Sequence, residues 1–113
     1  NQIINILQNY CSRNNLNFIN FYYKDYSIEE RIQLFNGAKF VIGVHGAAMM
    51  HTVFCKNAKI IEFICIKDCH STQLVNLSYN LEYWQIPLTN FGQFQKIISV
   101  DDNAIKSLIE ILS

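Results

Sequence analysis

Two kinds of apolar segment alternate along the chain, one with the spacing of a helix and one that is apolar throughout. Apolar residues three or four positions apart indicate an amphipathic helix, and a short continuous apolar run is typical of a strand in the interior of a parallel sheet. The pattern predicts helices at residues 2–11, 28–36, 47–55, 73–80 and 102–112, and strands at residues 17–22, 39–44, 59–66 and 82–86.

Local signals support several of these helices. Ser27 and Glu30 have the spacing of a capping box, so we expect a helix to begin there. Its apolar stripe is expected to contain Ile28, Ile32 and Phe35. An aspartate at 101 or 102 is expected to cap the last helix. The predicted inward positions of the first and last helices are Ile4, Leu7 and Cys11, and Ile105, Leu108, Ile109 and Leu112.

The fourfold alternation of strand and helix predicts an α/β fold. Such a pattern is typical of a three-layer, Rossmann-like domain with a mostly parallel sheet and helices on both faces. We expect residues 1–113 to form a single domain. The opening helix lacks the strand that should precede it, so this domain is expected to be incomplete and the chain to be a fragment of a larger protein.

Composition and charge exclude several classes of function. Half of the residues are apolar and the net charge is zero, which suits a packed globular core. Lysines and arginines are scattered, so the basic surface of a nucleic-acid-binding protein is missing. No apolar run approaches the roughly 20 residues of a membrane-spanning helix. We therefore expect neither nucleic acid as a partner nor a membrane segment.

The candidate chemistry lies between the second and third predicted strands, in residues 40–62. Ligands of open parallel sheets bind beyond the carboxyl ends of the strands. His45 and Gly46 follow such an end, and Ala47 and Ala48 begin the next helix. Small residues and the free amides of a helix start favour a phosphate there, and His45 adds a further donor. The alternative is an ordinary tight turn with a hydrogen-bonded histidine.

Glu62 interrupts the apolar run of the third predicted strand. A carboxylate near a strand end can bind the hydroxyls of a ribose, whereas a glutamate at a sheet edge would simply face water. We expect Met49 and Met50 to be core residues, because methionines in a helix are usually packing material. His51 is expected to lie near the site without acting in it.

Two further groups of residues, one of tyrosines and one of cysteines with a histidine, could bind a ligand or be purely structural. Tyr22, Tyr23 and Tyr26 follow a predicted strand and could stack on a base or cover the edge of the sheet. Asp25 and Asp68 are expected near the same rim. Cys65, Cys69 and His70 are close enough in sequence to suggest a redox or metal-binding domain, but their spacing matches no standard zinc signature.

Residues 40–62 resemble the signature of glycosyltransferase family 61. That signature has an alanine, a short apolar strand, a glycine, and a His-Gly-Ala motif that leads into a helix. A phenylalanine, an alanine and a strand ending in glutamate follow. The matching positions here are Ala38, Gly43, His45, Gly46, Ala47, Phe54, Ala58 and Glu62.

The resemblance implies a GT-B enzyme, of which this chain is most of the C-terminal, donor-binding half. The implied reaction is inverting transfer of a sugar from a UDP-sugar to a protein or glycan hydroxyl, without a metal or other cofactor. His45 and the amides of 46–48 would face the diphosphate, and Glu62 would lie near the ribose. The acceptor site and the catalytic base would lie partly on an absent N-terminal domain, so the catalytic residue is not identified in this chain and His45 is only a candidate. The fragment alone is then expected to be inactive. The fragment itself does not indicate a location, but for a eukaryotic protein the resemblance implies the secretory pathway (ER or Golgi).

The chain departs from the family pattern at several positions: Ala48 replaces a glycine, Met49 a leucine and His51 an asparagine, and Lys56-Asn57 stands where a Pro-Gly pair is usual before the third strand. These changes leave open a catalytically inactive module that binds a nucleotide with the same fold. The redox or metal-binding reading through Cys65, Cys69 and His70 is a further alternative.

Overall fold

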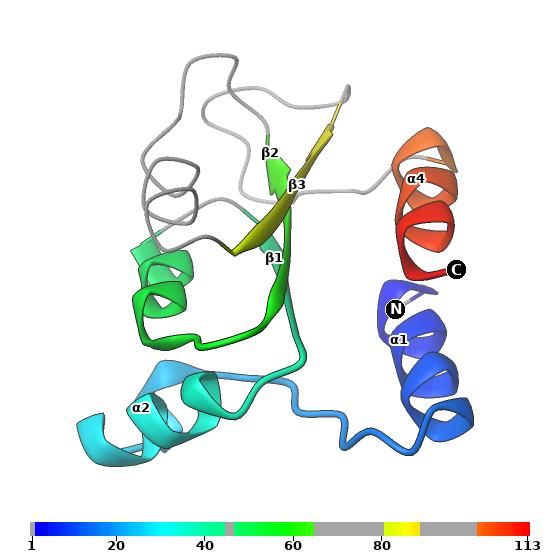
Figure 1. The fold of residues 1–113 in the computed structure, drawn as a ribbon. Coiled ribbons are helices and arrows are strands. Elements are labelled where there is room, and N and C mark those ends of the chain that lie inside the picture. Colours follow the sequence, from blue (N-terminus) through cyan, green and yellow to red (C-terminus); the bar gives the residue numbers. More distant parts are fainter. Residues whose placement is uncertain (1, 45–46, 65–80, 89–101) are drawn as a thin grey trace.

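The computed structural model describes residues 2–44, 47–64, 81–88 and 102–113 and has an α/β architecture, in which three parallel strands lie between two groups of helices (Figure 1). This arrangement is consistent with an incomplete Rossmann-like domain and confirms the expected fold class. None of the described helices is long and apolar enough to cross a bilayer. The elements are α1 (Gln2–Arg13), η1 (Tyr23–Asp25), α2 (Ile28–Asn36), β1 (Phe40–Val44), η2 (Ala47–Phe54), β2 (Lys59–Ile64), β3 (Glu82–Pro87) and α4 (Asp102–Leu112).

The sheet has the order β1-β2-β3, and both strand pairs are parallel. Three of the four predicted strands are therefore confirmed within the described residues. The prediction of a strand at residues 17–22 is wrong, because this segment is not paired with any described strand. Phe21 packs its ring edge-on against Phe35, whereas the Ile19 side chain is 48% exposed. An apolar run suits a strand, but strand geometry is stabilised only by a neighbouring backbone. The helix predicted at residues 73–80 lies outside the described residues.

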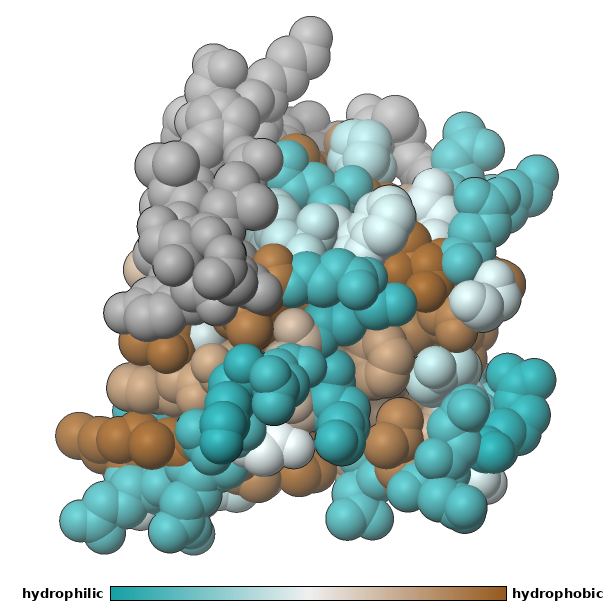
Figure 2. All heavy atoms as spheres, in the orientation of Figure 1, coloured by the Kyte–Doolittle hydropathy of each residue, from teal (hydrophilic) through white to brown (hydrophobic). Residues whose placement is uncertain are grey.

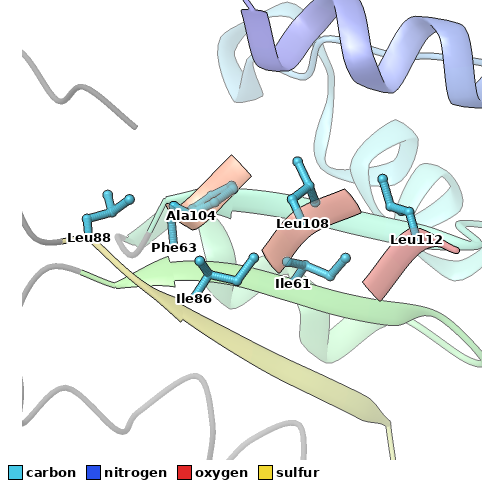
Figure 3. Close-up of a cluster of buried hydrophobic side chains, with 7 residues drawn as sticks. All are labelled: Ile61, Phe63, Ile86, Leu88, Ala104, Leu108 and Leu112. Carbon is cyan, nitrogen blue, oxygen red and sulfur yellow. The ribbon is translucent and has the colours of Figure 1, made fainter. Parts of the chain in front are cut away.

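One face of the sheet packs against α1 and α4. Figure 3 shows apolar side chains of β2 and β3 beneath the inner face of α4. Leu108 is completely buried, but Ile109 is 48% exposed, so its predicted inward position is wrong. On α1 the expected Leu7 contacts this cluster, together with Ile3 and Tyr10 rather than Ile4 and Cys11. The buried members of this apolar-face cluster are Ile61, Phe63, Ile86, Leu88, Ala104, Leu108 and Leu112.

The opposite face packs against α2 and η2. Side chains alternate along a strand, so Ile60 and Glu62 of β2 point to this face, whereas Ile61 points to the other. Aromatic rings join the two helices to each other, since Phe21, in the unpaired segment before α2, contacts both Phe35 of α2 and His51 of η2. The buried apolar members of this second cluster are Phe35, Met49, Cys55, Ala58, Ile60 and Leu81.

Helix α2 begins where the capping box predicts. The Ser27 hydroxyl accepts a hydrogen bond from the Glu30 amide, and the Glu30 carboxylate accepts one from the Ser27 amide. Its apolar stripe is largely outside the core, however: Phe35 is buried, but Ile28 is 67% and Ile32 38% exposed. Figure 1 shows α2 at the periphery, and Figure 2 shows hydrophobic side chains at the surface over it (lower left). The sequence pattern predicts the apolar face of α2, but whether that face is buried depends on which other elements pack against it.

The predicted helix after β1 exists, but it is a 3-10 helix. With three residues per turn, positions three apart lie on one face. Met49, Thr52 and Cys55 are accordingly all buried, whereas Met50 is 38% exposed. The Thr52 hydroxyl donates to the Met49 carbonyl at 2.8 Å, and the Cys55 amide donates to the Thr52 carbonyl at 3.0 Å. The prediction that Met49 is a core residue is therefore confirmed, and the same prediction for Met50 is wrong.

Candidate functional site

The carboxyl ends of all three strands lie at the same edge of the sheet. The register pairs Val44 with Phe63, and Ile64 with Pro87, so the strands end nearly level with one another. We call this the carboxyl edge; it is at the top of the sheet in Figure 1. Helix η2 begins close to it, because only His45 and Gly46 separate Val44 from Ala47. These two residues lie outside the described part of the chain, which nevertheless contains both of their neighbours.

Helix η2 is seated directly on β1 through a glycine. A Cβ atom added to Gly43 would lie 2.7 Å from the Met49 sulfur, closer than real Cβ contacts come. The absence of a side chain at Gly43 therefore allows the first turn of η2 to pack on the strand. Met49 is 5% exposed, so its thioether fills this space. The contact holds the start of η2, where Ala47 and Ala48 lie, beside the carboxyl edge.

Glu62 is fully buried on the central strand of the described sheet. Its register partners are Gly43 on β1 and Gln85 on β3. The alternative that Glu62 faces water at the edge of the sheet is therefore wrong. A buried carboxylate needs hydrogen-bond donors to offset its lost hydration. The hydroxyl of Tyr83 supplies one of them, by donating to Glu62 Oε1.

Tyr83 and Gln85 were not expected to be site residues. They are two positions apart on β3, so both point to the same face as Glu62. The Gln85 side-chain amide lies 3.0 Å from the Tyr83 hydroxyl, with Nε2 as the donor. Burial, above all, and the hydrogen bond to Glu62 raise the pKa of Tyr83 above its ordinary value. The phenol therefore keeps its proton at neutral pH. Their spacing of two positions in a predicted strand indicated that they share a face of the sheet. Only the register of β3 against β2 shows that this is the face of Glu62.

His51 is a packing residue in this structure. Its ring is stacked on Phe35, with 5.3 Å between centroids and 24° between planes, and it makes an edge contact with Phe21 at 5.5 Å. Phe54 lies at 6.4 Å. The imidazole thus joins η2 to α2 through ring contacts.

The tyrosines before α2 do not lie at the carboxyl edge. They follow an unpaired segment, and Figure 1 shows η1 and α2 at the end of the molecule from which β1 begins. Tyr22 and Tyr23 are 45% and 43% exposed and contact each other edge-on. The expectation that this cluster follows the end of a strand is therefore wrong. It depended on the strand predicted at 17–22.

The residues of the redox or metal-binding reading are not tested by the structure. Cys65, Asp68, Cys69 and His70 lie outside the described residues. Within residues 2–44, 47–64, 81–88 and 102–113, no three His, Cys, Asp or Glu side chains are grouped closely enough to hold a metal ion. Cys55 is buried, and this burial raises the pKa of its thiol to about 11, so it is protonated at neutral pH.

Comparison with known proteins gives one family. The family model described as Glycosyltransferase 61 matches residues 1–61, just over half of the chain. The matched segment runs from α1 through β1 and η2 into β2, and it ends immediately before Glu62. No curated protein and no solved structure gives a significant match.

Proposed function

The chain belongs to glycosyltransferase family 61, and we propose from this that it forms the nucleotide-sugar-binding part of a transferase that uses a UDP-sugar. The acceptor would be a hydroxyl of a protein or glycan, and transfer would invert the anomeric configuration. We propose a GT-B enzyme whose acceptor site and catalytic base lie partly on an N-terminal domain outside this chain. Residues 1–113 alone would then bind the donor without turnover.

The turn between β1 and η2 is the proposed diphosphate site. In a parallel sheet this position faces the crevice beyond the strands, and the first amides of a helix point outward without intrahelical partners. The amides of Gly46, Ala47 and Ala48 would donate to phosphate oxygens, and the His45 imidazole would add a donor that also serves as the catalytic candidate. These donors would stabilise the leaving UDP without a metal ion, as we expect for this protein.

One observation carries the proposal: the family match includes β1, its turn and η2, and the packing of Met49 on Gly43 holds η2 against the strand. Sugar transfer releases a diphosphate, so the developing negative charge must be met by fixed donors. A helix start seated beside a strand end provides backbone donors whose direction is fixed before the ligand arrives. Glu62, immediately after the matched segment, is the proposed ribose-binding acid.

Replacement of His45 by alanine tests this proposal in the intact protein. A hydrogen bond to a charged group is worth roughly 1.5–3 kcal/mol, so UDP should bind about tenfold to a hundredfold more weakly in isothermal titration calorimetry. The melting temperature should be nearly unchanged. His51→Phe is the matched control, because it removes the other nearby imidazole while keeping a ring among Phe21, Phe35 and Phe54. Unchanged UDP affinity in His45→Ala would contradict the proposed donor site.

A catalytically inactive member of the family is the second candidate. The observation in its favour is His51, which stands where family members usually have asparagine and packs against Phe35 and Phe21. An asparagine contact to a ligand from this position would thus be absent. UDP binding combined with no turnover of any UDP-sugar in the intact protein would support this candidate.

A further inference from the structure

Three polar side chains on two neighbouring strands form a directed hydrogen-bond chain under the carboxyl edge. They are Glu62 on β2, and Tyr83 and Gln85 on β3. Gln85 is the register partner of Glu62, and Tyr83 is paired with Ile60, so the phenol reaches diagonally along the sheet to the carboxylate. Cross-strand neighbours on one face come close enough for such contacts.

The donors in this chain all point toward the carboxylate. The Gln85 side-chain amide donates to the Tyr83 oxygen at 3.0 Å. Because a lone pair of that oxygen accepts this bond, the hydroxyl proton is directed to Glu62 Oε1. The carboxylate oxygen accepts this bond, and the bond restrains the rotation of the Glu62 side chain. A raised pKa keeps the Tyr83 phenol protonated for this purpose.

Glu62 is the one charged residue among the buried residues of β2. Its neighbours on the same strand, Ile60, Ile61 and Phe63, are apolar and buried. Replacing a buried charged network by apolar residues of similar volume is often neutral or stabilising. On the β1 side, the register partner Gly43 is covered by Met49 of η2. The carboxylate is therefore held between β3 and the strand on which η2 is seated, close to the proposed diphosphate site.

We propose that Tyr83 is a positioning residue for donor binding, which holds the Glu62 carboxylate in the orientation that receives the ribose hydroxyls of the nucleotide. Gln85 assists by fixing the direction of the Tyr83 hydroxyl. This inference rests on the proposed function, and it adds a specific pair of residues on β3, outside the segment matched by the family model. Tyr83 itself does not contact the reacting atoms.

The test compares the affinities of UDP and 2′-deoxy-UDP for the intact parent protein and for Tyr83→Phe, below the melting temperature of both. The parent should bind UDP about tenfold to a hundredfold more tightly, as for a hydrogen bond to a charged group. In Tyr83→Phe this ratio should fall severalfold, because the carboxylate loses the hydrogen bond from the Tyr83 hydroxyl. Tyr22→Phe is the matched control, since it removes a hydroxyl from an exposed tyrosine elsewhere. Its ratio should equal that of the parent.

The outcomes separate the two proposals. Suppose that Tyr83→Phe binds UDP with the parent's preference over 2′-deoxy-UDP, even at a lower melting temperature. Tyr83 is then structural, and the inference about Tyr83 fails while the proposed donor site stands. The inference also fails alone if the parent binds both nucleotides equally. If the parent binds neither, both proposals fail. Should Tyr83→Phe not fold, Gln85→Met decides: a reduced ratio supports the inference, and the parent's ratio overturns it.

Discussion

The two faces of the sheet are built from the same strands but differ in chemistry. Ile61 and Glu62 are adjacent on β2, and both are fully buried. Ile61 joins an entirely apolar cluster beneath α4, whereas Glu62 lies on the face covered by α2 and η2, with Tyr83 as its donor. The α4 side is thus built for packing, and the other side buries polar groups that are costly unless they are paired.

This difference separates stability from the proposed chemistry. Apolar burial contributes roughly 25 cal/mol per Å² and needs no direction, so many side chains can share it. A buried hydrogen-bonded acid needs particular partners in particular orientations. Changes on the α4 face should therefore alter unfolding without altering nucleotide selectivity, and changes near Glu62 should alter both.

The largest expected effect is on the α4 face. Leu108→Ala removes a completely buried side chain and should lower the free energy of unfolding by about 2–5 kcal/mol in urea titrations. Ile109→Ala, at a half-exposed position on the same helix, should cost much less. The UDP affinity of the folded protein should be the same in both. If fully folded Leu108→Ala protein bound UDP more weakly than the parent, the proposal that the α4 face affects stability but not nucleotide binding would be wrong.

A smaller effect is expected where η2 meets β1. Gly43→Ala puts a Cβ atom 2.7 Å from the Met49 sulfur, and displacing this side chain should cost about 1–3 kcal/mol. UDP affinity should also fall, because the start of η2 is displaced. In a Met49→Ala background the added methyl should cost little. Gly37→Ala is the control, since its Cβ would meet only the Gln33 carbonyl oxygen at 3.6 Å. Equal tolerance at positions 43 and 37 would contradict the account of Gly43.

The capping box should have a local effect. Ser27→Ala removes the acceptor for the Glu30 amide and should destabilise the protein by about 1 kcal/mol in thermal unfolding. UDP affinity should not change, because α2 lies at the opposite end from the carboxyl edge. Ser12→Ala, at an exposed position within α1, is the control and should be neutral. A change of UDP affinity in Ser27→Ala would show that α2 is coupled to the proposed site.

The smallest effect at neutral pH concerns Cys55, on the α2 and η2 side. Burial raises the pKa of its thiol from the ordinary 9.0 to about 11, so in this interval the unfolded state holds fewer protons than the folded state. The free energy of unfolding should therefore fall as pH rises from 9 to 11. In Cys55→Ala this contribution is absent, so the difference in stability between parent and variant should change with pH above 9. Parallel pH profiles would contradict the burial of an unpaired thiol here.

Much of the fold could be predicted from the sequence because its signals are local. The capping box at Ser27, the strands at 39–44 and 82–86 and the final amphipathic helix depend on nearby residues. The wrong predictions share another feature, since each needed a distant partner. The segment 17–22 has the composition of a strand but no paired neighbour, and the Ile28 stripe is helical but uncovered.

The candidate site divides in the same way. The His-Gly-Ala turn at 45–47 is contiguous, so its small residues and its position between a strand and a helix are visible in the sequence. Glu62 stands out because it interrupts an apolar run. Its burial and its bonds to Tyr83 could not be predicted, because they depend on how β3 is aligned with β2 across 21 residues of sequence.

The sequence by itself determined the order of helices and strands, the turn at the end of β1 and the family, since periodicity, capping and motif spacing are properties of neighbouring residues. Only the tertiary structure decided which faces are covered, that η2 has a three-residue period, and that Gln85 donates to Tyr83 and Tyr83 to Glu62. The physical reason is that burial and hydrogen-bond direction depend on strand register. A shift of one residue would turn each of these side chains to the opposite face.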